Sequence, residues 1–136
     1  MTSLRITRDI NEMDLEMIGT YLSEESYWAR GRTLEDIWTS MNNSICFAVL
    51  KGNRQIAFAR VVTDSIVFGW LMDFFVIESE QGNKVGDFLI RDILEIPELT
   101  KVNGIGLRTQ NAHGFYKKYG FDKIPTPETW MLKRNK

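Results

Sequence analysis

The chain has 136 residues, of which 43% are hydrophobic and 26% are charged, and its formal net charge is −1. These values favour one folded domain, residues 1–136, and exclude a disordered chain. The absence of a basic excess and of any bilayer-length apolar run leads us to expect neither a nucleic-acid nor a membrane partner.

The first part of the chain predicts a short strand and two helices. The strand covers residues 4–6. Asn11 is a candidate helix cap, because apolar residues follow it at helical spacing. A second helix should begin at Thr33, with Asp36 placed as in a capping box, and Asn42-Asn43 should end it.

Three strands should follow, at residues 45–50, 55–63 and 66–77. The sequence Lys51-Gly52-Asn53 suits a hairpin, because glycine and asparagine tolerate positive φ, and Asp64-Ser65 suits a second turn. Strands that follow one another through such short turns predict an antiparallel meander.

The pattern then changes to alternating helices and strands. A polar loop at residues 81–86 leads into a helix that Pro97 should stop. A strand at 104–108 and a helix at 112–119, capped by Gly120, come next. Two final strands are predicted at 121–124 and 130–133. The whole order predicts an α/β fold with a mixed, mostly antiparallel sheet flanked by helices.

The loop at 81–86 is a candidate phosphate site. A helix N-terminus presents unpaired N–H groups and a positive dipole end, and Gly82 and Gly86 allow close backbone approach. Taken alone, the same pattern is also that of an ordinary strand-to-helix connection.

A second motif lies at residues 109–121, Thr-Gln-Asn-Ala-His-Gly-Phe-Tyr-Lys-Lys-Tyr-Gly-Phe. The arrangement of Ala112, Tyr116, Gly120 and Phe121 resembles the signature helix of the GNAT superfamily of N-acetyltransferases, Ala-x-x-x-Tyr-x-x-x-Gly-Phe. The spacing back to the polar loop and the order of strands and helices match that family over nearly the whole chain.

The resemblance implies acetyl-coenzyme A as co-substrate, with its pantetheine arm held between splayed strands. Backbone groups of Phe75, Val76 and Ile77 would pair with the pantetheine amides. Lys84 stands where the family's loop has its middle glycine, and Thr109 stands where many members have asparagine, with Asn111 two residues later. The pyrophosphate would lie on the loop residues Gln81, Gly82, Asn83, Lys84, Val85 and Gly86.

The resemblance also assigns Tyr116 as the acid that protonates the leaving thiolate. Asp73 is the candidate base, because it interrupts a strongly apolar strand and shares a strand face with Phe75 and Ile77. The alternative is a structural Asp73 bonded to the backbone or to an arginine such as Arg60.

The connection between the first two helices is the candidate acceptor pocket. Tyr27, Trp28 and Arg30 suit a substrate with an apolar part and an anionic group, and Trp130 could close the pocket. The alternative is that the aromatic residues are partial core and the arginines are solvated.

The remaining chemistry is limited by single copies of cysteine and histidine. Cys46 lies in an apolar run and His113 near a helix start, so no metal site is expected and Cys46 should be buried and inert. Arg5, Arg8 and Asp9 open the chain without a long apolar run, which leads us to expect a cytoplasmic location.

Three functions remain in view. The first is an N-acetyltransferase that acts on a primary amine of a small molecule or peptide. A homodimer is compatible with this function. The second is a non-catalytic module that binds or senses acyl-coenzyme A on the same fold. The third is an interaction domain without a coenzyme.

Overall fold

The computed structural model describes residues 3–136, and its centre is a five-stranded sheet in the order β1-β2-β3-β4-β5. The first four strands are antiparallel neighbours, and β5 runs parallel to β4. The mixed, mostly antiparallel sheet is therefore confirmed. Its strands are β1 (Leu4–Thr7), β2 (Ile45–Lys51), β3 (Arg54–Thr63), β4 (Phe68–Val76) and β5 (Gly104–Gly106).

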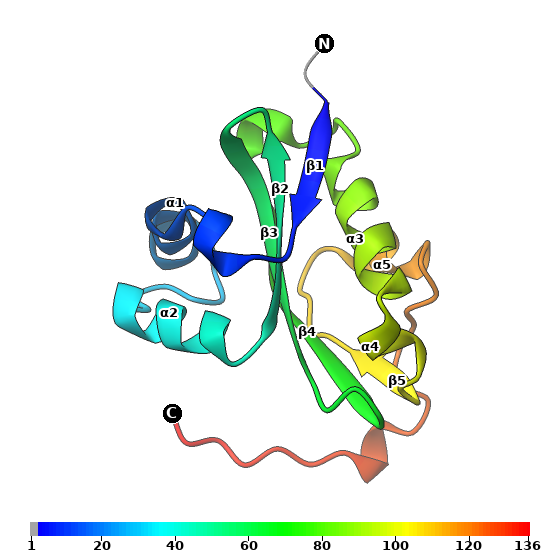
Figure 1. Ribbon diagram of the computed structural model, residues 1–136. Coiled ribbons are helices and arrows are strands. Elements are labelled where there is room, and N and C mark those ends of the chain that lie inside the picture. Colours follow the sequence, from blue (N-terminus) through cyan, green and yellow to red (C-terminus); the bar gives the residue numbers. More distant parts are fainter. Residues whose placement is uncertain (1–2) are drawn as a thin grey trace.

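Helices cover both faces of the sheet (Figure 1). One face carries α1 (Leu15–Thr20), the π-helical turn η2 (Tyr21–Glu25) and α2 (Leu34–Asn42); the other carries α3 (Val85–Glu95), α4 (Pro97–Thr100) and α5 (His113–Lys117). Each face buries its own apolar cluster, one around Leu89 and Ile90 of α3 and one around Ile18 and Ile37. Strands β2 and β3 lie between the clusters, which explains why they are apolar on both faces.

The helix starts show where local sequence signals hold. Thr33 accepts a hydrogen bond from the N–H of Asp36 at 3.0 Å, so the predicted cap of α2 is confirmed. The prediction of Asn11 as a cap is wrong, because Asp14 caps α1 through the N–H of Met17. Asn11 lies instead in the 3₁₀ turn η1 (Ile10–Glu12), which Asp9 caps.

Strand β4 contains a bulge at Asp73. Phe75 pairs with Phe58, and Met72 pairs with Arg60, so Asp73 and Phe74 together face one residue of β3. Asp73 adopts φ +53°, a left-handed conformation that an aspartate accepts at some cost. The bulge turns the Asp73 side chain toward the α1–α2 side of the sheet, where its partners lie.

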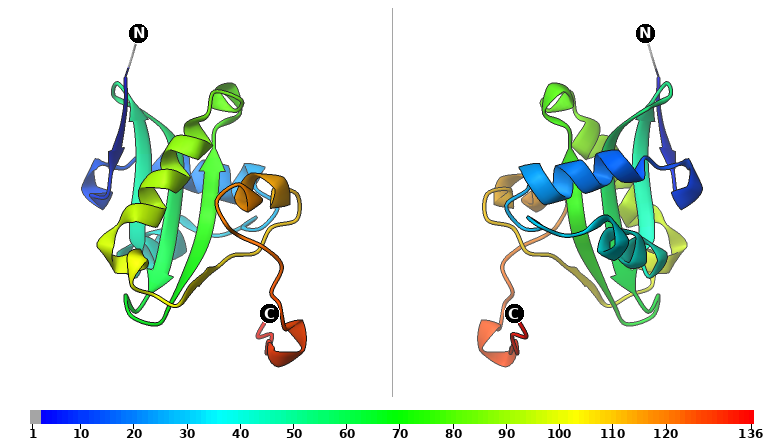
Figure 2. Two further views of the ribbon diagram at one scale, coloured as in Figure 1. Left: turned by 90° about the vertical axis from the view of Figure 1, so that its right-hand side faces the viewer. Right: turned by 90° about the vertical axis from the view of Figure 1, so that its left-hand side faces the viewer.

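The two predicted final strands, at 121–124 and 130–133, are wrong. After β5 the described chain holds no further strand, only α5 and the 3₁₀ turn η4 (Pro127–Thr129). Pro125 and Pro127 lack the N–H groups that a sheet requires and interrupt the segment between the two predicted strands. Figure 2 shows the C-terminal segment hanging below the body of the molecule.

The helices of the described residues are too short and too polar to cross a membrane.

Candidate functional site

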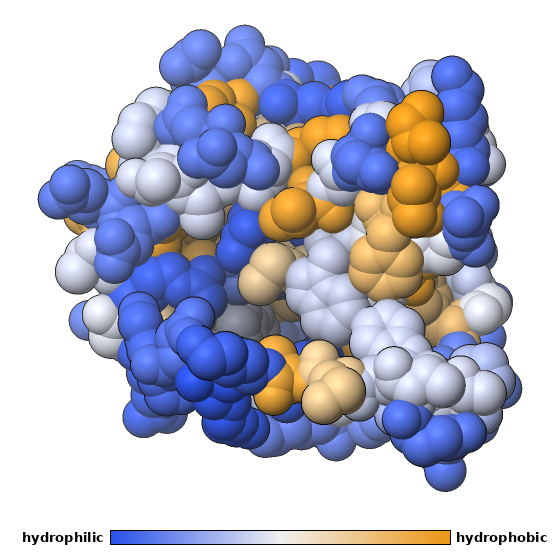
Figure 3. Space-filling view, turned by 90° about the horizontal axis from the view of Figure 1, so that it is seen from below, coloured by the Kyte–Doolittle hydropathy of each residue, from blue (hydrophilic) through white to orange (hydrophobic). Residues whose placement is uncertain are grey.

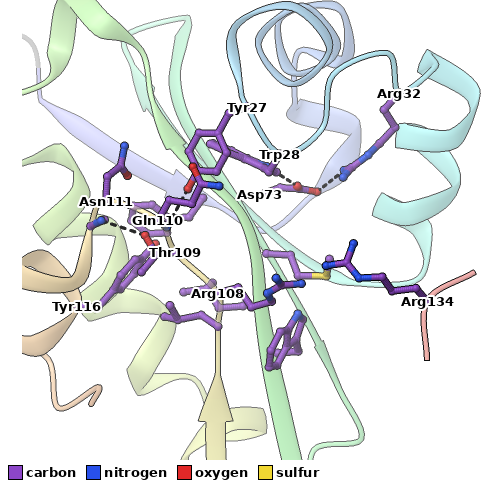
Figure 4. A pocket seen from close by; sticks show the side chains of 16 residues that line it. Tyr27, Trp28, Arg32, Asp73, Arg108, Thr109, Gln110, Asn111, Tyr116 and Arg134 are labelled. Atoms are coloured by element: carbon purple, nitrogen blue, oxygen red, sulfur yellow. Dashed lines mark hydrogen bonds and ion pairs between the residues drawn. The ribbon is translucent and has the colours of Figure 1, made fainter. Parts of the chain in front are cut away.

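A cavity opens where β4 and β5 separate. Their pairing ends at Trp70 and Gly106, and the chain beyond Gly106 then leaves the sheet. The gap holds a cavity of about 620 Å³ between residues 70–74 and residues 107–112 (Figure 4). A Cβ on Gly106 would lie 2.6 Å from the Trp70 ring, so only glycine permits this close approach at the point of separation. Splayed strands at the expected position therefore form the walls of the cavity.

Tyr116 lies on the wall of this cavity, near the end of the short helix α5 (His113–Lys117). Its ring packs edge-on against Phe74 of β4 and against Phe115 and Phe121. Burial, with a smaller contribution from Tyr27, raises the pKa of Tyr116 to about 12. The hydroxyl group is therefore protonated throughout the physiological pH range, which is the form that an acid requires.

Asp73 lies on the opposite wall and is held by three side chains. Its Oδ2 accepts hydrogen bonds from Arg60 Nε at 2.7 Å and from Arg32 Nη1 at 2.8 Å, and its Oδ1 accepts one from Trp28 Nε1 at 2.9 Å. Only 1% of the Asp73 side chain is exposed. The geometry favours the structural interpretation of this residue, since its lone pairs already face two cations and an indole.

The 81–86 loop has the geometry of an anion seat. Lys84 is the N-cap of α3 and makes no side-chain capping bond, so the N–H groups of the first turn have no intrahelical partner. Gly82 has φ +86° and Lys84 φ +63°, so lysine accepts the left-handed conformation that a glycine would adopt freely. The loop is anchored from below by Glu80, which bonds to Lys51 at 3.2 Å and to Asn83.

Helix α5 packs against the start of α3 and so links the 81–86 loop to the β4–β5 cavity. A Cβ on Gly86 would lie 3.3 Å from the ring of Phe115, which shows how closely α5 packs against the start of α3. Asp87 accepts hydrogen bonds from Tyr119 and Lys118, and these contacts lower the pKa of its carboxyl group. Tyr119 is therefore bonded to α3 and does not line the 620 Å³ cavity.

The other expected coenzyme residues surround the same region, but only some of their side chains are free of hydrogen bonds within the chain. Gln81 donates its amide to the carbonyl of Val76, and Thr109 accepts the N–H of Ala112, so both side chains already have partners in the chain. Asn111 lines the cavity. Phe75 stacks on Tyr21 at 4.0 Å on the α1 side, so only its backbone could meet a ligand between the strands, as the sequence suggested.

The expected acceptor residues divide into two groups. Tyr27 and Trp28 line the cavity, and Tyr27 Oη accepts the N–H of Gln110 from the facing wall at 3.1 Å. Arg30 donates instead to the carbonyl of Ser26 and is not part of the lining. Trp130 packs near Phe68, at 6.1 Å between ring centroids, in a different groove. These two residues are therefore not brought to the pocket.

Three arginines were missed by sequence reasoning or placed only generally. Arg32, Arg108 and Arg134 all line the cavity, and Figure 4 shows their side chains directed toward it. Asp73 is the single acidic residue among the described lining residues, and it is bound to Arg32. The signal for Arg32 was Asp73 itself, since a buried carboxylate requires a cation; Arg108 and Arg134 gave no local signal. No cluster of metal-ligating side chains occurs in residues 3–136.

Comparison with known proteins places this chain in a described family. Residues 42–123 match the family model of the GNAT acetyltransferase domain. The crystal structure of a Xanthomonas campestris pv. campestris protein assigned to the GNAT family is 30% identical and covers 98% of this chain and 94% of its own, with a TM-score of 0.95. A proposed acetyltransferase of Gibberella zeae is 24% identical over 138 residues, which are 85% of this chain and 77% of that protein.

A structure with a bound ligand shows the same fold. A proposed acetyltransferase from Clostridium acetobutylicum, crystallised with acetyl-CoA, is 15% identical, covers 98% of this chain and 96% of its own, and has a TM-score of 0.69.

Proposed function

This chain belongs to the GNAT acetyltransferase family, and we propose that it transfers the acetyl group of acetyl-coenzyme A to a primary amine of a small molecule or peptide. The observation that carries the proposal is Tyr116, a protonated phenol with a pKa of about 12 on the wall of the β4–β5 cavity. A non-catalytic coenzyme-binding module has no need of a proton donor at that point.

The described residues fit the coenzyme in two places. The uncapped N-terminus of α3, with Gly82 in a left-handed conformation, offers backbone N–H groups to a pyrophosphate, and Lys84 adds a positive charge beside them. The edge of β4 beyond Trp70 has lost its β5 partner, so its peptide groups can pair with the amides of a pantetheine arm. When bound, acetyl-coenzyme A supplies the acetyl group as a thioester.

Tyr116 supplies the proton that the leaving sulfur requires. The acceptor nitrogen forms a bond to the acetyl carbonyl carbon, the carbon–sulfur bond breaks, and Tyr116 Oη gives its proton to the thiolate. The nitrogen loses its own proton to water, which returns one to Tyr116. Asp73 keeps Arg32 and Trp28 in place beside the cavity, and its three hydrogen bonds occupy most of its lone pairs.

The acceptor is best matched by an amine that also carries an anionic group. Arg108 and Arg134 have no carboxylate partner within 4 Å in residues 3–136, and Tyr27 and Trp28 add aromatic surface. Nearby cations disfavour a protonated amine and lower its pKa, so the pocket itself helps to produce the neutral nucleophile. A carboxylate or phosphate on the acceptor would bind these arginines.

The proposal is tested by release of free coenzyme thiol from acetyl-coenzyme A in the presence of a panel of amines. We expect Tyr116→Phe to lower kcat by about 100-fold, within the range for loss of an acid, with little change in coenzyme affinity. Tyr119→Phe is the matched control. It removes a phenolic hydroxyl three residues after Tyr116, and Tyr119 does not line the cavity.

Thermal unfolding distinguishes the outcomes. Coenzyme at about 100 times its dissociation constant should raise the free energy of unfolding of wild type and of Tyr116→Phe alike, by roughly 2.7 kcal/mol. Stabilisation without thiol release for any amine would favour the non-catalytic module. If millimolar coenzyme does not stabilise the protein, the proposed coenzyme site is contradicted.

The acceptor class is tested by comparing phenylalanine with phenethylamine, which differ only by the carboxylate. We expect the wild-type protein to favour phenylalanine in kcat/KM and Arg108→Gln to lose that preference. Because the variant is compared with wild type for both amines, their different intrinsic reactivity cancels. An unchanged preference in Arg108→Gln would contradict the role of the arginine.

A further inference from the structure

One wall of the β4–β5 cavity, residues 107–112, is anchored only at its two ends. Leu107 and Ala112 pack partly against the apolar cluster of α3. Between them, none of residues 108–111 is buried, and strand pairing with β4 has already ended at Gly106. The N–H of Ala112 donates to Thr109 Oγ1 at 3.0 Å, which forms a turn within the wall but does not join the wall to another element.

One hydrogen bond joins the middle of this wall to the opposite side of the cavity. Gln110 donates its N–H to Tyr27 Oη at 3.1 Å, and Figure 4 shows this cross-cavity bond between the two walls. Within residues 3–136, it is the only hydrogen bond that residues 108–111 make to another part of the fold. Tyr27 is 45% exposed, so burial in the core does not explain where its hydroxyl group lies.

Tyr27 is itself held to the sheet through its neighbour Trp28. The two rings meet edge to face, with 5.1 Å between their centroids. Trp28 Nε1 donates to Oδ1 of Asp73 in the β4 bulge, and Asp73 is bonded to the buried Arg60 of β3. A continuous series of contacts therefore runs from the sheet through Trp28 and Tyr27 to Gln110.

The cavity leaves its walls without packing against each other. Its volume is about 620 Å³, and Figure 3 shows the lower face of the molecule hollowed, with hydrophilic side chains on one side of the hollow and apolar ones on the other. Atoms that line a hollow lack contacts on that side. The separation of the two walls therefore depends on the few bonds that cross between them.

The position of the 107–112 wall also affects the proposed acid. Ala112 is the N-cap residue of α5, and its carbonyl accepts the N–H of Tyr116 at 3.1 Å. A displacement of the wall would therefore shift the first turn of the helix that carries Tyr116.

We propose that Tyr27 is a positioning residue, whose hydroxyl group holds the 107–112 wall at the separation that the coenzyme arm requires before the coenzyme binds. The role toward the coenzyme rests on the proposed function. A wall that is already in place costs less entropy on binding, so the cross-cavity bond should increase coenzyme affinity. The opposite arrangement, in which Tyr27 withholds the Gln110 N–H from a ligand, predicts tighter binding once the hydroxyl group is removed.

The first experiment measures the wall in the free protein, by amide order parameters from NMR relaxation. In Tyr27→Phe we expect the order parameters of residues 108–111 to fall from values of ordered backbone to below about 0.6. Tyr21→Phe is the matched control, because Tyr21 of η2 stacks on Phe75 outside the cavity and keeps its ring. Unchanged order parameters in Tyr27→Phe, or a wild-type wall that is equally flexible, would overturn the proposal.

A second variant, Trp28→Phe, tests the connection to the sheet. It keeps an aromatic ring beside Tyr27 but loses the N–H that Asp73 accepts. We expect a smaller fall in the order parameters of residues 108–111 than in Tyr27→Phe, and no further fall in the double variant, because the cross-cavity bond is already absent there. An unchanged wall in Trp28→Phe, or a further fall in the double variant, would contradict the series of contacts.

Calorimetric titration with acetyl-coenzyme A measures the consequence for binding. We expect Tyr27→Phe to weaken the affinity about 3- to 10-fold, as for the loss of one hydrogen bond. Its melting temperature without ligand should stay within about 2 °C of wild type, since Tyr27 is half exposed, whereas a merely structural role would lower it. Equal or tighter binding by Tyr27→Phe would overturn the positioning role. If wild type does not bind the coenzyme, the proposed function fails, and the order parameters still decide whether Tyr27 holds the wall.

Discussion

Tyr116 is a phenol whose environment keeps its proton in place. Its pKa of about 12 comes chiefly from burial among Phe74, Phe115 and Phe121, with Tyr27 nearby. The raised pKa makes the hydroxyl a weaker acid at equilibrium, but it keeps the phenol protonated, which is the form that the proposed acid role requires.

This raised pKa predicts the shape of the pH–rate profile. The protonated form of Tyr116 persists below its pKa and is lost only as pH rises through about 12. We therefore expect kcat/KM to rise with pH as the acceptor amine deprotonates and then to stay level up to pH 10. Initial rates of thiol release from pH 6 to 10 provide the measurement. A falling limb near pH 8–9 that disappears in Tyr116→Phe would contradict it.

Replacement of Asp73 should lower the stability of the protein more than it changes the chemical step. In Asp73→Asn the left-handed backbone is retained, because asparagine tolerates it well, but Arg60 and Arg32 lose their counter-charge. Leaving the buried Arg60 unpaired should lower the free energy of unfolding by about 3 kcal/mol. Urea denaturation measures this change, with Asp92→Asn on the exposed face of α3 as control.

The opposite result would restore Asp73 as the base. If Asp73→Asn keeps wild-type stability but lowers kcat, and if the rise of kcat with pH is altered, the carboxylate accepts a proton during turnover. A loss of stability together with a pH profile of unchanged shape fits the positioning role.

At the scale of elements, the sequence predicted those parts whose signals are local. The meander β2–β3–β4 follows from short turns between apolar runs, and α2 and α3 follow from periodic apolar residues with clear ends. The predicted 66–77 strand begins late, at Phe68, because Asp64 accepts the N–H groups of Ile66 and Val67 and extends the turn. The C-terminal strands failed because strand propensity near Trp130 does not decide whether a partner edge is within reach.

Within the candidate site, too, the sequence predicted the parts with local signals and missed the others. The loop at 81–86 and the position of Tyr116 were predictable, since both belong to one continuous strand–loop–helix pattern. Arg32 rather than Arg30 enters the cavity because the connection before α2 is irregular and has no period from which direction can be read. Arg108 and Arg134 come from segments remote in sequence, so only the folded chain brings them together.

The contact between α3 and α5 predicts different effects for two glycines. Gly86→Ala places a methyl group 3.3 Å from the Phe115 ring and should displace α5, which lowers kcat several-fold and costs about 1 kcal/mol of stability. Gly114→Ala, on α5 itself, meets no atom within 4 Å and should stabilise the protein by about 0.5–1 kcal/mol. Melting temperature and kcat are measured for both variants. Equal effects would show that α5 is not positioned by this contact.

At the scale of the whole molecule, the two apolar clusters hold the sheet unequally. β2, β3 and β4 lie between the clusters on both faces, whereas β5 is joined to the sheet by only three residue pairs. Residues 107–112 beyond β5 contain no regular element, and they form one wall of the cavity. This wall of the cavity is therefore held to the sheet less firmly than the opposite wall, which β4 forms.

This unequal distribution of stability makes a prediction for amide hydrogen exchange. In the free protein, residues 82–87 and 107–112 should exchange fastest among the ordered segments, and β2 and β3 slowest. Saturating coenzyme should slow exchange several-fold at 82–87, where N–H groups would bind phosphate, and at 107–112, which would close on the pantetheine arm. Helix α2 does not line the cavity and serves as the internal control. Protection of α2 equal to that of 107–112 would indicate general tightening, and it would remove the argument that the ligand lies between β4 and β5.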